Sequence, residues 1–117
     1  MNSDELKERT KHFAIKIIKF FQSLPKSDEV RIIGNQLVKS STSVASNYRA
    51  ACRSRSQNEF YSKICIVVEE CDESLFWLEL IDESQIAGGE LLQDLVKEAN
   101  ELTQIFSSTR KTLKLKL

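Results

Sequence analysis

Apolar side chains recur along most of the chain at intervals of three or four residues, the spacing that marks one face of an α-helix. Four segments carry this pattern, with short polar stretches between them. They predict helices over residues 4–24, 28–53, 57–84 and 90–112. Four long amphipathic helices with short connections pack most simply as an antiparallel up-down-up-down bundle. We therefore expect an all-α fold, with residues 1–117 forming a single four-helix bundle domain.

Residues that favour helix ends lie at the boundaries of these segments. Ser27 and Ser56 are good caps for the starts of the second and third helices. Gly88 or Gly89 is expected to take the left-handed conformation that ends the third helix. The fourth helix is expected to fray into the basic sequence TRKTLKLKL at 109–117, a disordered end or a tail that touches RNA.

The third predicted helix has more apolar surface than one bundle needs. In SLFWLELI, residues 74–81, the side chains of Leu75, Leu78 and Ile81 share the stripe that faces the core. The apolar residues outside that stripe are candidates for an oligomer interface: Ile66, Phe76, Trp77 and Leu80. Aromatic side chains are favoured anchors at such contacts. The alternative for Trp77 is that it only covers the edge of the core.

Composition and charge narrow the class of protein. Hydrophobic residues make up 41% and charged residues 29% of the chain, as in soluble globular proteins. No apolar run approaches the roughly 20 residues that span a membrane, and the N-terminus does not look like a secretion signal. The odd number of cysteines, three, fits reduced thiols. We expect a cytoplasmic protein without a membrane partner.

Basic residues are unevenly distributed although the whole chain is neutral, with 17 basic and 17 acidic residues. Arg49 and Arg53 lie one helical turn apart and can share a face. The candidates for contact with RNA or DNA are Arg49, Arg53, Arg55 and Lys63. Phosphate binding by such a cluster is one interpretation. The other is that these side chains are solvated or pair with acids of a neighbouring subunit.

No catalytic or metal-binding pattern emerges from the acidic region between residues 69 and 90. The only histidine, His12, lies outside this region, and no metal-ligand spacing is present. We expect no enzyme activity, cofactor, metal or small-molecule substrate. Counting back from the turn near Arg55 instead places Lys39 of the second helix beside Glu70 of the third.

The segment from Ser40 to Ile81 resembles a family of four-helix bundle proteins associated with intervening sequences of bacterial large-subunit ribosomal RNA genes. The matching motifs are SSTSV followed by NYR at 47–49, RSRS at 53–56 and EF at 59–60. The resemblance implies a small cytoplasmic bacterial protein that forms a homopentameric ring and has no assigned activity. A related branch, the accessory variability determinants of diversity-generating retroelements, binds nucleic acid and partners a reverse transcriptase.

Two functions fit these observations. The leading hypothesis is a non-enzymatic, homo-oligomeric helical scaffold or adaptor. The alternative is an RNA- or DNA-binding accessory protein that partners a retroelement reverse transcriptase. The balanced charge of this chain departs from the basic retroelement branch.

Overall fold

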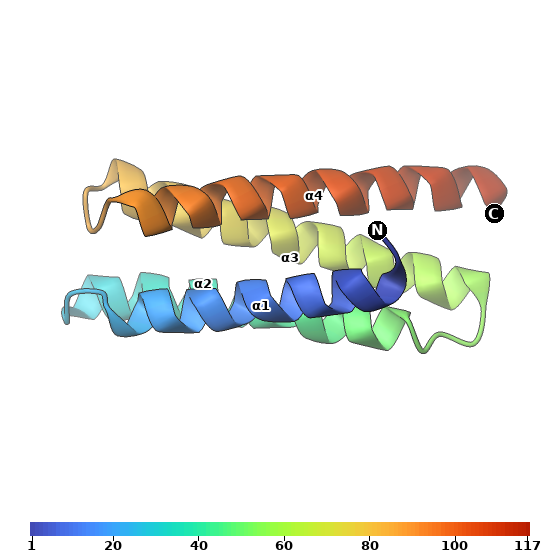
Figure 1. Cartoon of the computed structure of the whole chain (residues 1–117), viewed down its shortest axis with the longest axis horizontal. Helices are drawn as coiled ribbons and strands as arrows, with labels where there is room; N and C mark the ends of the chain where they lie inside the picture. Colours follow the sequence, from blue (N-terminus) through green and yellow to red (C-terminus); the bar gives the residue numbers. More distant parts are fainter.

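A computed structural model describes residues 1–117 as four α-helices without a β-strand. The helices are α1 (Ser3–Gln22), α2 (Asp28–Ala51), α3 (Gln57–Glu83) and α4 (Glu90–Lys116). Figure 1 shows that the chain reverses direction at each of the three connections, so consecutive helices are antiparallel. The bundle is elongated, with extents of 45 × 22 × 20 Å. The predicted all-α four-helix bundle is therefore confirmed.

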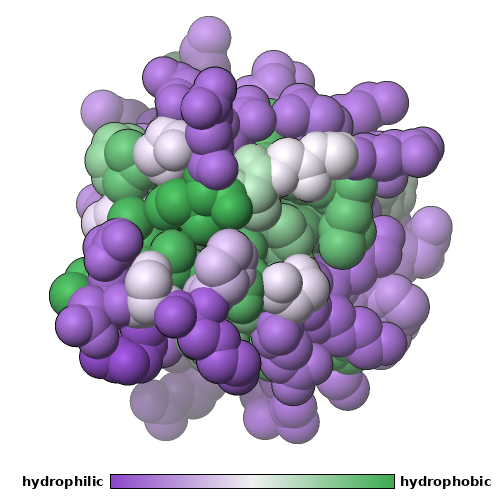
Figure 2. Space-filling model, turned by 90° about the vertical axis from the view of Figure 1, so that its left-hand side faces the viewer, coloured by the Kyte–Doolittle hydropathy of each residue, from purple (hydrophilic) through white to green (hydrophobic).

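The four helices form a square in which each packs against two neighbours. The contacting pairs are α1 with α2, α2 with α3, α3 with α4, and α1 with α4, and the last pair has the sparsest contact. One continuous core of apolar side chains runs between the helices, including the fully buried Phe13, Leu37, Leu78 and Phe106. Figure 2 shows apolar atoms reaching the surface at the end with the α1–α2 and α3–α4 connections, inside a polar rim.

Two of the predicted caps hold the starts of α2 and α3. The Ser27 hydroxyl accepts a hydrogen bond from the Val30 N–H at 3.4 Å, and the Ser56 hydroxyl accepts one from the Glu59 N–H at 3.0 Å. Each cap satisfies a backbone donor that has no partner within its helix. The sequence RSRS at 53–56 therefore ends in the cap that begins α3.

The end of α3 differs from the expectation that a glycine would take the left-handed conformation. Gln85 takes it instead, with φ of 61°. The following N–H, from Ile86, bonds back to the Ile81 carbonyl at 3.1 Å, and the Ile86 side chain packs on the core. This apolar contact explains why the turn forms at a residue other than glycine. Gly89, with φ of 100°, is the residue before α4.

The C-terminal tail also differs from expectation, because α4 continues to Lys116. Leu113 is buried and belongs to the core, which fixes the last turns of the helix. In Figure 1 the end of α4 extends beyond the start of α1 and lies along the beginning of α3. The basic residues of the tail are therefore carried on an ordered helix: Arg110, Lys111, Lys114 and Lys116.

A close approach between α1 and α2 depends on Gly34. A β-carbon at this position would overlap the ring of Phe21 on α1. The absence of a side chain at Gly34 therefore lets the Phe21 ring pack directly against the α2 backbone. Further along, towards the start of α1, the outer surface between these helices opens into a groove.

Candidate functional site

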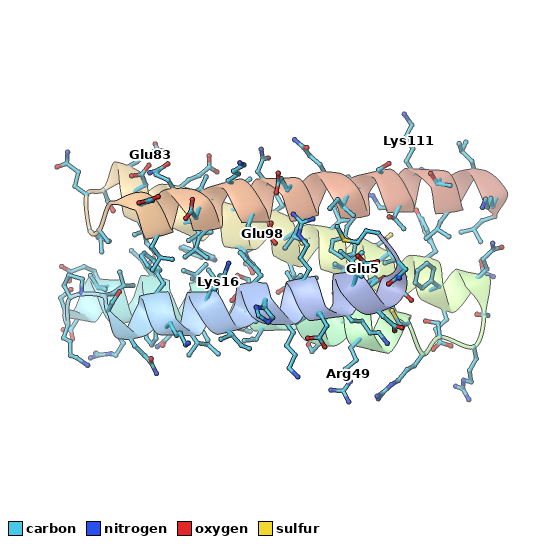
Figure 3. The ribbon with its side chains drawn as sticks, viewed as in Figure 1. Glu5, Lys16, Arg49, Glu83, Glu98 and Lys111 are labelled. Carbon is cyan, nitrogen blue, oxygen red and sulfur yellow. The ribbon has the colours of Figure 1, made fainter.

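The groove between α1 and α2 has a volume of about 710 Å³. Small side chains form part of its lining, among them Ala14 of α1 and Thr42 and Ala45 of α2. The basic residues along its two sides are Lys7 and Lys11 of α1, Arg49 of α2, and Arg53 in the turn that follows α2. We call this surface the basic groove. Figure 3 shows Arg49 extending outward from the bundle.

The register of α1 and α2 produces this arrangement. Lys7 and Lys11 are four positions apart on α1, so they lie on the same face of that helix, and Arg53 in the turn after α2 lines the groove together with Arg49. The acidic residues Asp4 and Glu8 also line the groove, which leaves four basic and two acidic groups, a net charge of +2. Only Lys7 has an acidic partner within ion-pair distance, Asp4 at 3.2 Å. Three cationic groups in the groove are therefore free to bind an acidic partner.

The structure brings together only part of the predicted nucleic-acid site. Arg49 and Arg53 share the groove, whereas Arg55 is exposed in the α2–α3 connection and Lys63 is half-buried on α3. Sequence reasoning missed Lys7 and Lys11 because they are about 40 residues away in the chain. The only signal for them was the antiparallel pairing of the first two helices.

The outward face of α3 combines acidic and apolar side chains. At intervals of three or four residues it carries Ile66, Glu69, Glu73, Phe76 and Leu80. We call this row the α3 ridge. Phe76 is 53% exposed and Ile66 is 39% exposed. The two carboxylates have no cation within ion-pair distance in this chain.

The two aromatic side chains of α3, Phe76 and Trp77, differ in how far they are buried. Trp77 is half-buried and packs against the core. Phe76 lies edge-on to it, with ring centroids 4.9 Å apart and ring planes at 72°. Trp77 thus packs at the edge of the core and supports the exposed ring of Phe76, and its place in an oligomer interface stays a prediction.

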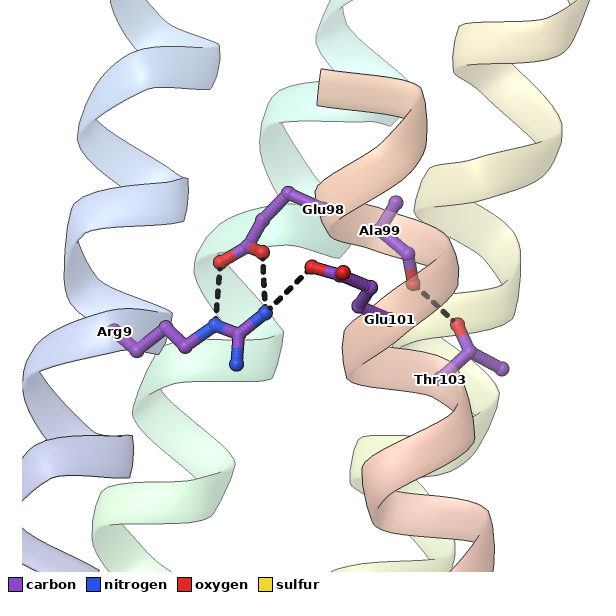
Figure 4. Close-up of polar contacts among 5 residues, drawn as sticks. All are labelled: Arg9, Glu98, Ala99, Glu101 and Thr103. Atoms are coloured by element: carbon purple, nitrogen blue, oxygen red, sulfur yellow. Dashed lines mark hydrogen bonds and ion pairs between the residues drawn. The ribbon is translucent and has the colours of Figure 1, made fainter. Parts of the chain in front are cut away.

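A further polar cluster joins α1 to α4. Arg9 donates hydrogen bonds to both carboxylate oxygens of Glu98, from Nε at 2.8 Å and from Nη2 at 2.6 Å, and Nη2 also donates to Glu101 at 2.9 Å (Figure 4). The hydrogen bond from Arg9 lowers the pKa of Glu98, against the opposing effect of burial. The cluster lies in the seam with the sparsest helix contacts, so we assign it a structural role.

Glu70, next to the ridge, has a raised pKa. Burial is the largest cause, and repulsion by Glu73 adds to it. The hydroxyl of Ser43 and the charge of Lys39 act in the opposite direction. The expected neighbourhood of Lys39 and Glu70 is therefore present, although the two side chains do not form an ion pair.

The structure contains no group of three or more His, Cys, Asp and Glu residues arranged to hold a metal ion. Burial raises the pKa of Cys71 to about 12, so this thiol stays protonated at neutral pH. Cys52 and Cys65 are half-buried and, like Cys71, free. The surfaces that remain as candidates are the basic groove and the α3 ridge.

Comparison with known families decides what the chain is related to. Residues 3–108 match the family described as 23S rRNA-intervening sequence protein. The chain belongs to this family. The match includes α1, α2 and α3 and most of α4, and with them both candidate surfaces. None of the curated proteins compared with the chain matches it.

A solved structure shares the fold of this chain. It is described as a protein with unknown function from the S23 ribosomal protein family of Bacteroides thetaiotaomicron. The two sequences are 25% identical, the alignment covers 90% of this chain and 97% of the other, and the TM-score is 0.82. No helix of this family member is long and apolar enough to cross a membrane.

Proposed function

We propose that this family member is a non-enzymatic, homo-oligomeric scaffold or adaptor of the cytoplasm, and that it associates through the α3 ridge. The observation that carries the proposal is the exposed ring of Phe76 on a well-formed helix. Full burial of such a side chain contributes roughly 1.5–3 kcal/mol, and about half of this ring is still open to solvent. A second subunit would bury the remainder.

The character of α3 supports this proposal. It is the most apolar of the four helices, and its apolar residues are the least confined to one face. A helix with apolar side chains on two sides usually has two packing partners. The bundle core is the first partner, and another copy of the chain is the second. The resemblance to ring-forming relatives supports five as the number of copies.

Sedimentation velocity over a range of protein concentrations tests the proposal. We expect the wild type to sediment as a multiple of the 13.4 kDa chain. Phe76→Ser should shift it towards the single-chain mass while circular dichroism still reports a helical fold. Leu91→Ser is the matched control, because Leu91 is 48% exposed but lies at the start of α4. A wild type that remains monomeric at high micromolar concentration would contradict the proposal.

The basic groove favours RNA or DNA binding as a second candidate function. The lysine pair on one side of the groove and the arginine pair on the other can contact successive phosphates of a strand. Affinity for a structured RNA should fall steeply with salt, because each phosphate contact releases counterions. Reversing the charge of Arg49, Arg53 and Arg55 together should abolish this binding. Undiminished affinity in that triple variant would rule out the site.

A further inference from the structure

We infer that the α3 ridge of one copy seats in the basic groove of the next copy, so that two different surfaces of the chain form each contact. This inference rests on the proposed self-association and specifies the surfaces that meet. Four observations support it: complementary charge, matching residue spacing, the common direction of α1 and α3, and the common height of the two surfaces.

Charge distinguishes this contact from an association of like surfaces. The ridge presents Glu69 and Glu73, and neither has a cationic partner within the chain. The groove presents Lys11, Arg49 and Arg53, which have no acidic partner. Two ridges in contact would bring carboxylates together, and two grooves would bring cations together, which is unfavourable. When the ridge of one copy faces the groove of another, the carboxylates of the ridge lie opposite the cations of the groove.

The spacing of side chains on α1 matches the spacing on the ridge. Both helices carry residues at successive intervals of four, three and four positions: Lys7, Lys11, Ala14 and Ile18 on α1, and Glu69, Glu73, Phe76 and Leu80 on α3. The first two positions bring opposite charges together. At the third, the large ring of Phe76 faces the small side chain of Ala14. At the fourth, Leu80 faces Ile18, which is 38% exposed in the single chain.

The direction of the helices allows this match. In Figure 1, α1 and α3 run the same way along the bundle. Copies related by rotation about an axis parallel to the helices keep that direction. The α3 helix of one copy therefore lies parallel to α1 of its neighbour, as the equal spacing of the two rows requires.

The two surfaces also lie at the same height along the bundle. Phe21 of α1 contacts Gly34 of α2, and the Ser74 hydroxyl of α3 donates a hydrogen bond to the Ser40 hydroxyl of α2 at 2.9 Å. Counting along the helices from these two contacts places Lys11 within about one turn of the ridge carboxylates. Neighbouring copies then dock with little shift along the axis. A contact between two different surfaces without such a shift closes into a ring when the rotation between copies divides a full turn.

Charge reversal tests the inference. Glu69→Lys with Glu73→Lys reverses the ridge, and Lys7→Glu with Lys11→Glu reverses the two groove residues that face these positions. Each pair alone places like charges across the contact and should shift the wild-type oligomer to monomer in sedimentation velocity. A chain with all four substitutions has opposite charges again, in exchanged positions, and should recover the wild-type mass.

A matched control uses two exposed lysines on α4, Lys97→Glu with Lys111→Glu, which should leave the mass unchanged. Figure 3 shows Lys111 pointing away from the bundle. If a reversed chain does not fold, Glu69→Gln with Glu73→Gln replaces it. Loss of two exposed ion pairs should weaken association by about three- to tenfold at low salt. Unchanged association in that neutral variant would overturn the inference.

The outcomes separate this inference from the proposed function. A monomeric wild type overturns both. A wild-type oligomer whose mass is unaffected by either reversal overturns the inference and leaves the scaffold proposal intact. If the chain with all four substitutions folds but stays monomeric, the inference is also overturned and the scaffold proposal stands. If reversing the groove abolishes RNA binding but leaves the mass unchanged, the groove binds nucleic acid and the inference is overturned.

Discussion

The α1/α4 seam and the α3 ridge both carry pairs of glutamates, but only the pair in the seam has a cationic partner within the chain. In the seam, Glu98 and Glu101 are bound by Arg9 of the opposite helix. On the ridge, Glu69 and Glu73 have no cation within ion-pair distance. The seam lies between two helices of one chain, so its charges stabilise the bundle. The ridge faces outward, where its charges are available to another molecule.

The pKa values of Glu98 in the seam and Glu70 beside the ridge are shifted in opposite directions. Arg9 lowers the pKa of Glu98, whereas burial and the nearby Glu73 raise the pKa of Glu70. The ionised carboxylate is thus stabilised by folding in the seam and disfavoured by folding beside the ridge. Opposite pKa shifts predict opposite effects of pH and of charge removal on the free energy of unfolding.

Removal of Arg9 should have the largest effect on stability. Arg9→Met keeps the aliphatic packing but leaves Glu98 and Glu101 without their cation. The arginine and Glu98 side chains are each only 25% exposed, so we expect a loss of about 1–2 kcal/mol in the free energy of unfolding. Denaturant titration at one fixed protein concentration measures this loss.

The matched control for Arg9 is Arg31→Met. Arg31 also forms an ion pair, with Asp28 at 2.9 Å, but its side chain is 65% exposed. Such exposed pairs contribute about 0.2–0.5 kcal/mol. Equal losses for the two variants would contradict the structural role assigned to the seam.

Acid should remove the contribution of Glu98. Its pKa is lower in the folded state than in the unfolded chain, so its stabilising effect is present above the unfolded value of about 4.3 and is lost as the pH falls through the folded value. Glu98→Gln should therefore destabilise the protein at neutral pH and change it little in strong acid. Thermal unfolding of both proteins across this range checks the sign. A constant difference at every pH would contradict it.

The smallest effect is expected for Glu70→Gln. The pKa of Glu70 is raised on folding, so its charge opposes folding above the folded value and ceases to do so below the unfolded value. Removing the charge should increase the free energy of unfolding at neutral pH by no more than about 0.5 kcal/mol, because solvent screens this half-exposed group. The gain should disappear in acid. A clear loss of stability at neutral pH would show that the contact with Ser43 outweighs the cost of burial.

The sequence was sufficient for the fold because helix periodicity and caps are local properties. Ser27 and Ser56 cap their helices as expected. The errors arose where distant packing decides a helix end. Ile86 holds the left-handed turn at Gln85, and Leu113 extends α4, because both side chains reach a core formed by other helices.

The sequence predicted less of the candidate site than of the fold. Spacing alone placed Arg49 and Arg53 on one face, and they do share the groove. The opposite wall, with Lys7 and Lys11, depends on how α1 and α2 align. Arg9 lies 89 residues from Glu98, and periodicity does not specify which polar side chains meet across a bundle.

Zero-length carbodiimide cross-linking of a mixture of isotope-labelled and unlabelled copies tests the ridge-in-groove contact most directly. This reagent joins a lysine amine to a carboxylate in direct contact, and the Lys7–Asp4 pair at 3.2 Å is an internal positive control. Within one chain the bundle core separates α1 from the outward face of α3. We predict products between copies that join Lys7 or Lys11 to Glu69 or Glu73. An assembled protein that gives the control product but none of these would contradict the account.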